Sequence, residues 1–203
     1  MFDFTPWQEL VVHAKCAHNE LAAIRNRVQQ ELPEIDESLL KKLRVVAGCI
    51  NLRGQHDPEW WTSYRGRKLT VYQSAHESLA GLPIRRQDAY VKAFVKPEKL
   101  LKHGDPRMIQ ARSPRYNCAI GAYLRPIEHQ LYQLRALGRW FASDEPVIAK
   151  GLNLRARAEV IQRKMQRFGR CYSLDLSRFD AHIAIPILRV EHSVYLRAYG
   201  NAP

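Results

Sequence analysis

The spacing of apolar side chains predicts helices along most of the chain, because residues three or four positions apart share one helical face. The first predicted helix runs between Trp7 and Gln30, and the second from Asp36 or Ser38 to about Gly48. Further helices are predicted over residues 72–79, over about 120–134 with a start or kink near Pro126, over 156–168 on a strongly basic segment, and around Val190, where Pro186 suits a first turn.

Two segments are predicted to be strands. Ala89–Lys96 alternates and is rich in β-forming residues, and Cys171–Leu176 is a short apolar stretch that ends at a turn. Helices outnumber these strands, so the predicted fold class is α+β and helix-rich.

Composition narrows the class of protein. The chain has 203 residues, 46% of them apolar, which is enough to build a core. No run approaches the roughly 20 apolar residues of a membrane span, and the first residues do not resemble a secretory signal. With 32 Lys and Arg against 20 Asp and Glu, the net charge is +12, which favours nucleic acid as a partner.

The candidate chemistry begins with two carboxylates. Asp175 is expected at the end of the second predicted strand, and Asp180 follows five residues later, past a turn. A carboxylate presented into a cleft is a natural ligand for Mg²⁺, and such ions assist phosphoryl transfer. The spacing also fits ordinary turn and helix-cap aspartates, and taken alone it favours that interpretation.

A basic arm precedes these carboxylates and is opposed only by Glu98 and Asp105. It starts on the first predicted strand and continues through loop residues. Its cations could line a channel for RNA and triphosphate, or could form a solvated basic face without a fixed ligand. They are Lys92, Lys96, Lys99, Lys102, Arg107, Arg112 and Arg115.

Several blocks of the sequence, in order, resemble the tombusvirus-like RNA-dependent RNA polymerases. Residues 94–99 and 105–117 are similar to motif F of that family, which here spans about residues 92–117. Residues 149–153 resemble its Lys-Gly-Leu-Asn block, and Leu174–His182 resembles its motif A. The resemblance covers roughly residues 40–200, which one chance motif would not give.

The resemblance implies a role for each matching residue. Asp175 would coordinate Mg²⁺ or Mn²⁺, aided by the backbone carbonyl of Leu176, and Asp180 would read the ribose 2′-hydroxyl of the nucleotide. Lys96 and Arg107 would contact the triphosphate. The remaining implied contacts are to RNA, made by Lys99, Lys102, Arg112, Arg115, Asn153 and Arg155.

The resemblance also implies an incomplete right-hand polymerase, with fingers over residues 1–170 and the start of the palm over 171–203. The Ser-Gly…Thr…Asn helix and the Gly-Asp-Asp hairpin of the family are not found, so the chain alone is expected to be inactive. It would be either a truncated reading frame or one half of an enzyme completed by a second chain. The expected location is the host cytoplasm, beside membrane-bound replication complexes. The alternatives are a basic RNA-binding protein without catalysis and a pseudo-enzyme scaffold.

Overall fold

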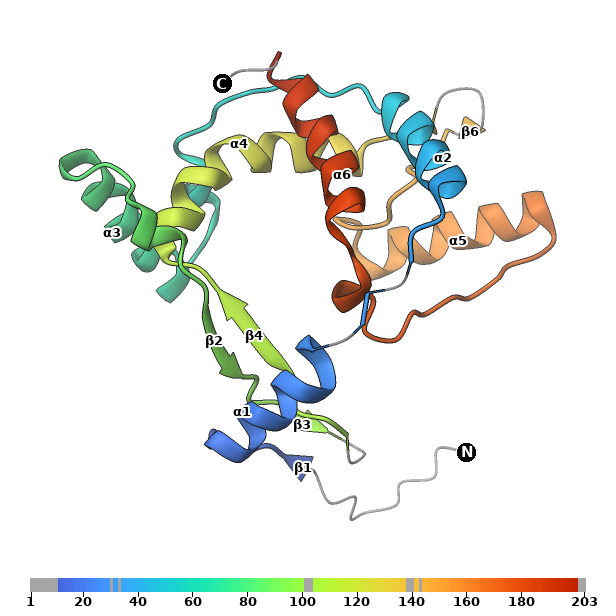
Figure 1. Ribbon diagram of the computed structural model, residues 1–203. Helices are drawn as coiled ribbons and strands as arrows, with labels where there is room; N and C mark the ends of the chain where they lie inside the picture. The colour runs from blue at the N-terminus through green and yellow to red at the C-terminus, as the bar shows by residue number, and fades with distance from the viewer. Residues whose placement is uncertain are drawn as a thin grey trace.

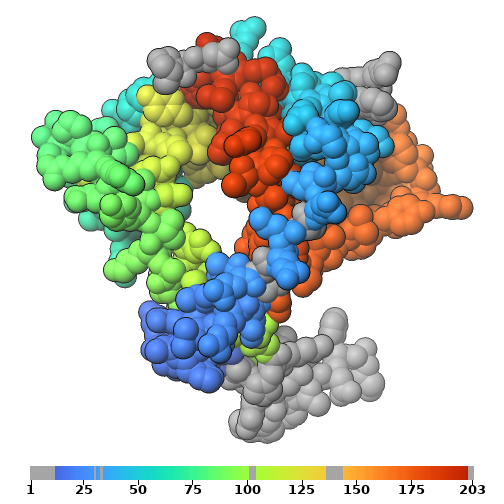
Figure 2. All heavy atoms as spheres, in the orientation of Figure 1, coloured from blue at the N-terminus to red at the C-terminus, as the bar shows by residue number. Residues whose placement is uncertain are grey.

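The computed structural model describes residues 11–29, 31–32, 34–100, 104–137, 141–142 and 144–200. Its helices and strands surround a central opening, which the ribbon and the space-filling view show from the same side (Figures 1 and 2). Helical groups form two sides of the opening, and a narrow β-region closes the third.

The largest buried cluster joins helices that are far apart in the sequence. α2 (Glu37–Gly48) lies beside α6 (Ile185–Ala198), and both pack on α4 (Pro114–Tyr132) (Figure 1). Ile127 of α4 is fully buried there. The other buried members are Leu40, Ala47, Leu52, Val190 and Val194.

A second packed region forms the corner between α3 (Arg67–Gly81) and the first half of α4. The short 3₁₀ helix η2 (Trp60–Ser63) inserts Trp60 into this corner, where its indole N–H donates to the Cys118 carbonyl at 3.0 Å. Gly121 is required opposite, because a Cβ atom there would lie 2.3 Å from the Trp60 ring. The corner is therefore closely fitted around one indole.

Short strands form the β-region. β2 (Lys92–Val95) pairs antiparallel with β4 (Met108–Ala111), and β1 (Val11–Val12) pairs antiparallel with β3 (Lys99–Leu100). α1 (Ala17–Ala23) and the π-helix η1 (Ile24–Val28) lie against this region (Figure 1). The remaining elements are η3 (Arg86–Ala89), β5 (Ala136–Leu137), β6 (Phe141–Ala142), α5 (Leu154–Phe168) and η4 (Phe179–His182).

The predicted helix-rich class is confirmed, and most predicted helices are present. α2 begins after the N-cap Asp36, whose side chain accepts from the Ser38 amide at 2.7 Å. α4 contains Pro126 in its interior instead of starting there, because Ser113 caps the helix and Pro114 occupies its first turn. α3 and α5 also begin earlier than predicted.

The structure of the β-region differs from the sequence predictions at three places. The first helix does not extend back toward Trp7 in the described residues, because Val11 and Val12 pair with β3 and α1 starts only at Ala17. The strand predicted over residues 89–96 is confined to Lys92–Val95, since η3 extends to Ala89. The prolines and charges around Met108–Ala111 predict a loop, but these residues form β4. Pairing with β2 overrides that local composition.

The strand predicted over residues 171–176 is wrong. Residues 171–176 form no regular secondary structure, and Tyr172 and Leu174 are 81% and 87% exposed. A strand requires a neighbouring strand to accept and donate its backbone hydrogen bonds. No strand of the described part of the chain lies alongside this segment.

Candidate functional site

A cavity of about 640 Å³ lies where three parts of the chain meet. They are the basic β-hairpin formed by β2 and β4, the π-helix η1, and the turn before α6. Three chain segments line it: residues 27–28, residues 96 and 107–110, and residues 176 and 178–181. Four of the lining side chains are cationic and one, Asp180, is a carboxylate. The cavity therefore favours a polyanion that presents one group able to bind a carboxylate. The cations are Arg27, Lys96, Arg107 and Arg178.

The hairpin holds its two cavity cations together through one acidic side chain. The Lys96 amide donates to the Arg107 carbonyl at 2.7 Å, which continues the β2–β4 ladder by one bond. The Glu98 carboxylate lies 2.8 Å from Lys96 Nζ and 3.3 Å from Arg107 Nε. The hydrogen bond from Lys96 and the nearby guanidinium of Arg107 lower the pKa of Glu98. Glu98 therefore stays ionised and keeps both cations at the cavity.

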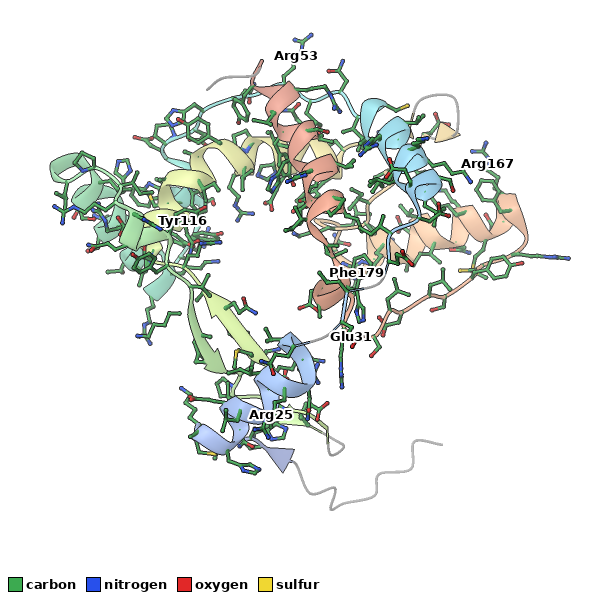
Figure 3. The ribbon with its side chains drawn as sticks, viewed as in Figure 1. Arg25, Glu31, Arg53, Tyr116, Arg167 and Phe179 are labelled. Atoms are coloured by element: carbon green, nitrogen blue, oxygen red, sulfur yellow. The ribbon has the colours of Figure 1, made fainter. Side chains whose placement is uncertain are left out.

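The opposite wall is a tight turn. Arg178 adopts a left-handed backbone conformation, with φ 52° and ψ 37°, and is the one residue other than glycine with positive φ in the described ranges. Its carbonyl accepts from the Ala181 amide at 3.0 Å and lies 2.9 Å from His182 Nδ1. These contacts start η4 and place Asp180 in the cavity wall. Phe179, within this turn, lies across the opening from Tyr116 of α4 (Figure 3).

Asp105 connects the two walls. Its Oδ2 atom lies 2.6 Å from Arg178 Nη2, and its Oδ1 atom accepts from Asn26 Nδ2 at 2.8 Å. Its backbone carbonyl accepts from Arg27 at 2.9 and 3.2 Å. The basic arm, η1 and the turn at Arg178 are therefore joined at one residue.

The predicted site residues divide into two groups. The cavity brings together Lys96, Arg107, Leu176 and Asp180. Asp175 is adjacent to Leu176 and is exposed, but it is not among the lining residues. Its role as a metal ligand stays a prediction.

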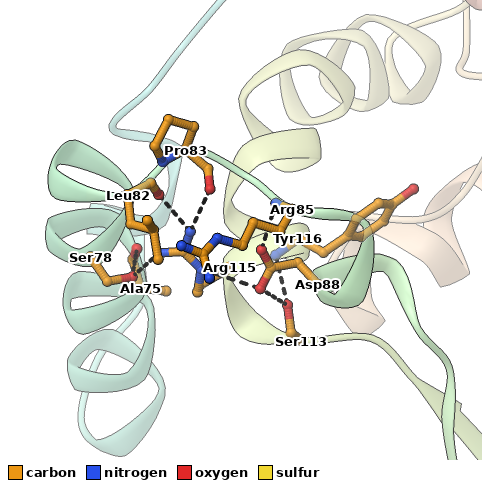
Figure 4. Close-up of polar contacts among 9 residues, drawn as sticks. All are labelled: Ala75, Ser78, Leu82, Pro83, Arg85, Asp88, Ser113, Arg115 and Tyr116. Atoms are coloured by element: carbon orange, nitrogen blue, oxygen red, sulfur yellow. Dashed lines mark hydrogen bonds and ion pairs between the residues drawn. The ribbon is translucent and has the colours of Figure 1, made fainter.

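The side chain of Arg115 is held by contacts with other parts of the fold (Figure 4). Its guanidinium lies 3.2 Å from the buried Asp88 and donates to Ser78 Oγ at 2.6 Å and to the Leu82 carbonyl at 2.6 Å. Asp88 also accepts from the Arg85 amide at 2.9 Å. In this structure Arg115 joins α3 to the start of α4, and its contact with RNA stays a prediction.

The other predicted RNA contacts lie outside the cavity or outside the described residues. Arg112 donates to the Ala89 carbonyl and lies 5.0 Å from the Tyr116 ring centre. Asn153 caps α5 by accepting from the Ala156 amide at 2.8 Å, and Arg155 pairs with Glu159 at 3.0 Å on the exposed side of that helix. Lys99 is exposed on β3, and Lys102 lies outside the described residues.

The donors that this chain offers to a metal are few. The carboxylate of Asp175 and the carbonyl of Leu176 are hard oxygen ligands of the kind Mg²⁺ prefers. Over the ranges described here, no three His, Cys, Asp or Glu side chains converge as a metal site would require. The donor type fits Mg²⁺, and the donor number leaves positions for waters and substrate phosphates.

The sequence alone did not identify three residues of the site. Arg27 was not identified because it lies in a predicted helix close to Arg25, and its spacing does not distinguish it from an ordinary surface arginine. Asp105 was noted only as an acid within the basic arm, since its partners Arg178 and Asn26 lie 73 and 79 positions away. Arg178 was inside the motif A resemblance but received no role.

Comparison with known proteins places the chain in a family of viral polymerases. A family model described as viral RNA dependent RNA polymerase matches residues 7–203, and the chain belongs to that family. It is 38% identical over 164 residues to the RNA-directed RNA polymerase of Turnip crinkle virus, covering 76% of this chain. It is also similar to the RNA-directed RNA polymerases of Groundnut rosette virus (strain MC1), 32% identical over 95% of the chain, and Maize chlorotic mottle virus, 42% identical over 68%.

The chain spans only a fraction of these relatives: 20%, 24% and 14% of their lengths, respectively. Each relative carries the matching region inside one longer polypeptide, so the comparisons do not support the predicted second chain that supplies the missing motifs. No solved structure matches the fold. The right-hand arrangement and the boundary between fingers and palm at residue 170 therefore stay predictions. Among the described helices, none is both long and apolar enough to cross a membrane.

Proposed function

We propose that this chain is the part of an RNA-directed RNA polymerase that receives the incoming nucleoside triphosphate beside the template. The enzyme would transfer a nucleotide to the 3′-hydroxyl of the growing RNA strand and release pyrophosphate. The observation that carries the proposal is the cavity that joins Lys96 and Arg107 to Leu176 and Asp180, across roughly 80 residues of sequence. A polymerase needs these cations and carboxylates to face one substrate.

Each wall of the cavity would contribute a different part of substrate binding. Lys96 and Arg107 would bind triphosphate oxygens, Lys as a point charge and Arg through its fork of N–H donors. Asp180 would accept a hydrogen bond from the ribose 2′-hydroxyl, the group that distinguishes RNA precursors from DNA precursors. Orientation by opposite walls would hold the α-phosphate for attack.

A divalent ion, Mg²⁺ or Mn²⁺, would be held by Asp175 and the Leu176 carbonyl. When bound, it would neutralise charge that develops on the phosphate oxygens during transfer. Asp175 directly precedes Leu176, which lines the cavity, so a metal held by these two residues would border the cavity on the side of Leu176. The template and nascent RNA would follow the basic arm, with affinity that falls as salt rises.

A basic RNA-binding protein without catalysis is the second candidate, favoured by the net charge of +12. It gives no reason for a carboxylate in the wall of a cationic cavity, since Asp180 would repel phosphate in the absence of a bridging metal. The presence of Asp180 in the same cavity as Arg107 therefore favours the polymerase. The host cytoplasm, beside replication membranes, remains the predicted location.

The test is Asp175→Ala in the full-length polymerase that carries this region, assayed by extension of a radiolabelled primer–template. We expect nucleotide addition to be abolished, because the metal loses its carboxylate, while RNA binding measured by filter retention changes by less than twofold.

The matched control is Asp144→Ala, which removes an exposed carboxylate outside the cavity and should leave extension unchanged. Primer extension that survives Asp175→Ala would refute the role of Asp175 as the metal ligand and with it the proposed substrate site. Loss of RNA binding together with extension would instead indicate a damaged fold, and circular dichroism of the variant would show it.

A further inference from the structure

We infer that Asp105, in the basic arm, is a positioning residue that sets how strictly the polymerase selects ribonucleotides, and that it acts through Arg178. This inference rests on the proposed function, because it assumes that Asp180 contacts the ribose. It assigns a function to the contact between the two walls of the cavity. The resemblance to viral polymerases gave neither residue a role.

The contact is specific on both sides. Both carboxylate oxygens of Asp105 are used, one by Arg178 Nη2 at 2.6 Å and one by Asn26 Nδ2 at 2.8 Å. Two further hydrogen bonds from Arg27 hold the Asp105 carbonyl. η1 thus fixes Asp105 from behind, and Asp105 in turn fixes Arg178. The side chains of Asp105 and Arg178 are 30% and 32% exposed, so water weakens the ion pair only in part.

Arg178 needs an external contact to keep its conformation. A residue with a Cβ atom in the left-handed region carries a local energetic cost, which the surrounding structure must offset. The turn begins at Arg178, and Asp180 follows two residues later in η4. Loss of the ion pair with Asp105 would therefore loosen the turn and would move Asp180 relative to Lys96 and Arg107.

The expected consequence concerns the sugar more than the phosphates. Lys96 and Arg107 are held by Glu98 on the hairpin, independently of Arg178. The triphosphate should then still bind when the Asp105–Arg178 pair is lost, while the hydrogen bond from the 2′-hydroxyl to Asp180 is misplaced. Selection against deoxyribonucleotides should fall more than total activity.

The experiment measures kcat/KM for a ribonucleotide and for the matching deoxyribonucleotide in primer extension by the full-length polymerase. Asp105→Asn and Arg178→Met should each lower the ratio of the two values by about tenfold, within the range of coupling found between contacting charged side chains. The double variant should lose no more than either single variant. Arg178→Lys, which keeps a charge near Asp105, should retain more selectivity than Arg178→Met.

The control is Glu128→Gln, which removes a pair of similar exposure, Arg125 with Glu128 at 2.7 Å, confined to one helix. It should leave the ratio unchanged. A purely structural role would lower both kcat/KM values in proportion and keep the ratio constant, and that result would overturn the inference. Additive losses in the double variant would also overturn it. Asp175→Ala tests the proposed site separately, because activity that persists in that variant refutes the metal role of Asp175, whereas an unchanged ratio in the Asp105 and Arg178 variants refutes only this inference.

Discussion

The corner between α3 and α4 and the segment at residues 170–180 differ in how their side chains are used. In the corner, Trp60 is 8% exposed and Asp88 is 7% exposed, and both have hydrogen-bond partners from distant parts of the chain. In the segment, Tyr172 and Leu174 are 81% and 87% exposed, and the backbone of residues 171–176 is unpaired. Within the described residues, these side chains of the corner are buried and hydrogen-bonded, whereas those of the segment are exposed to solvent.

The region that stabilises the fold is therefore separate from the segment that carries the candidate metal ligand. Hydrogen bonds and a closely fitted indole make the corner a rigid frame for the start of the basic hairpin. The candidate metal ligand, Asp175, belongs to this exposed segment. Functional groups commonly lie on loops that a rigid scaffold positions, and here the ion pair of Asp105 with Arg178 joins the basic arm to the loop.

Removal of the indole should have the largest effect on this frame. Trp60→Ala leaves a cavity next to Gly121 and removes the hydrogen bond to Cys118, so we expect the free energy of unfolding to fall by about 3–5 kcal/mol. Urea denaturation of the 203-residue chain, followed by far-UV circular dichroism, measures this loss.

Trp61→Ala is the matched control for that prediction. Trp61 is half-buried, and its indole donates only to Pro58, three residues away. Its replacement should cost clearly less than that of Trp60. An equal or larger loss for Trp61→Ala would show that the corner is not organised around Trp60.

Acid should destabilise the corner between α3 and α4 by protonating Asp88. This effect should be smaller than that of Trp60→Ala and larger than that of Leu174→Ala. The hydrogen bond from the Arg85 amide and the charge of Arg115 lower the pKa of Asp88 below its ordinary value of 3.8. A group with a lowered pKa in the folded state stabilises the fold above its unfolded pKa, and this contribution is lost as pH falls through the folded value. The stabilisation should therefore be present at pH 6 and decline below about pH 4.

The measurement is the urea midpoint of wild type and Asp88→Asn at pH 6 and at pH 3. The wild type should lose more between the two pH values than the variant, since the amide cannot titrate. Glu37→Gln, at an exposed pair with Arg44, serves as a control and should follow the wild type. Parallel losses in wild type and Asp88→Asn would contradict the assignment.

Truncation in the exposed segment should have the smallest effect. Leu174→Ala removes an isobutyl group that is 87% exposed, so the free energy of unfolding of this chain should change by less than about 0.5 kcal/mol. The same urea experiment decides the point. A loss comparable to that of Trp60→Ala would mean that Leu174 is buried in solution and that the comparison between the two regions fails.

The sequence predicted the regular helices well because their signals are local. Asp36 before α2 and Gly81 at the end of α3 mark helix boundaries through caps and backbone preferences that act within a few residues. The resemblance also selected four of the residues that line the cavity. Both kinds of information lie in short stretches of sequence.

The remaining features depend on partners that are distant in the sequence. β4 exists because β2 pairs with it, and residues 171–176 lack a strand because no described strand lies beside them. Arg115 has the composition of an RNA contact, yet its guanidinium is used by Asp88 and by two carbonyls near Leu82. A local pattern cannot distinguish a cation that binds RNA from one that binds its own fold.

The buried cluster beneath α6 also has a consequence for how the protein acquires its fold during synthesis. Leu40 cannot reach its full set of neighbours until Val190 and Val194 have been translated, about 150 residues later. At the usual pace of synthesis, α2 would wait roughly 8–30 s with an uncovered apolar face. Ribosome pausing within the codons for α6 should thus prolong the interval in which the nascent chain depends on chaperones.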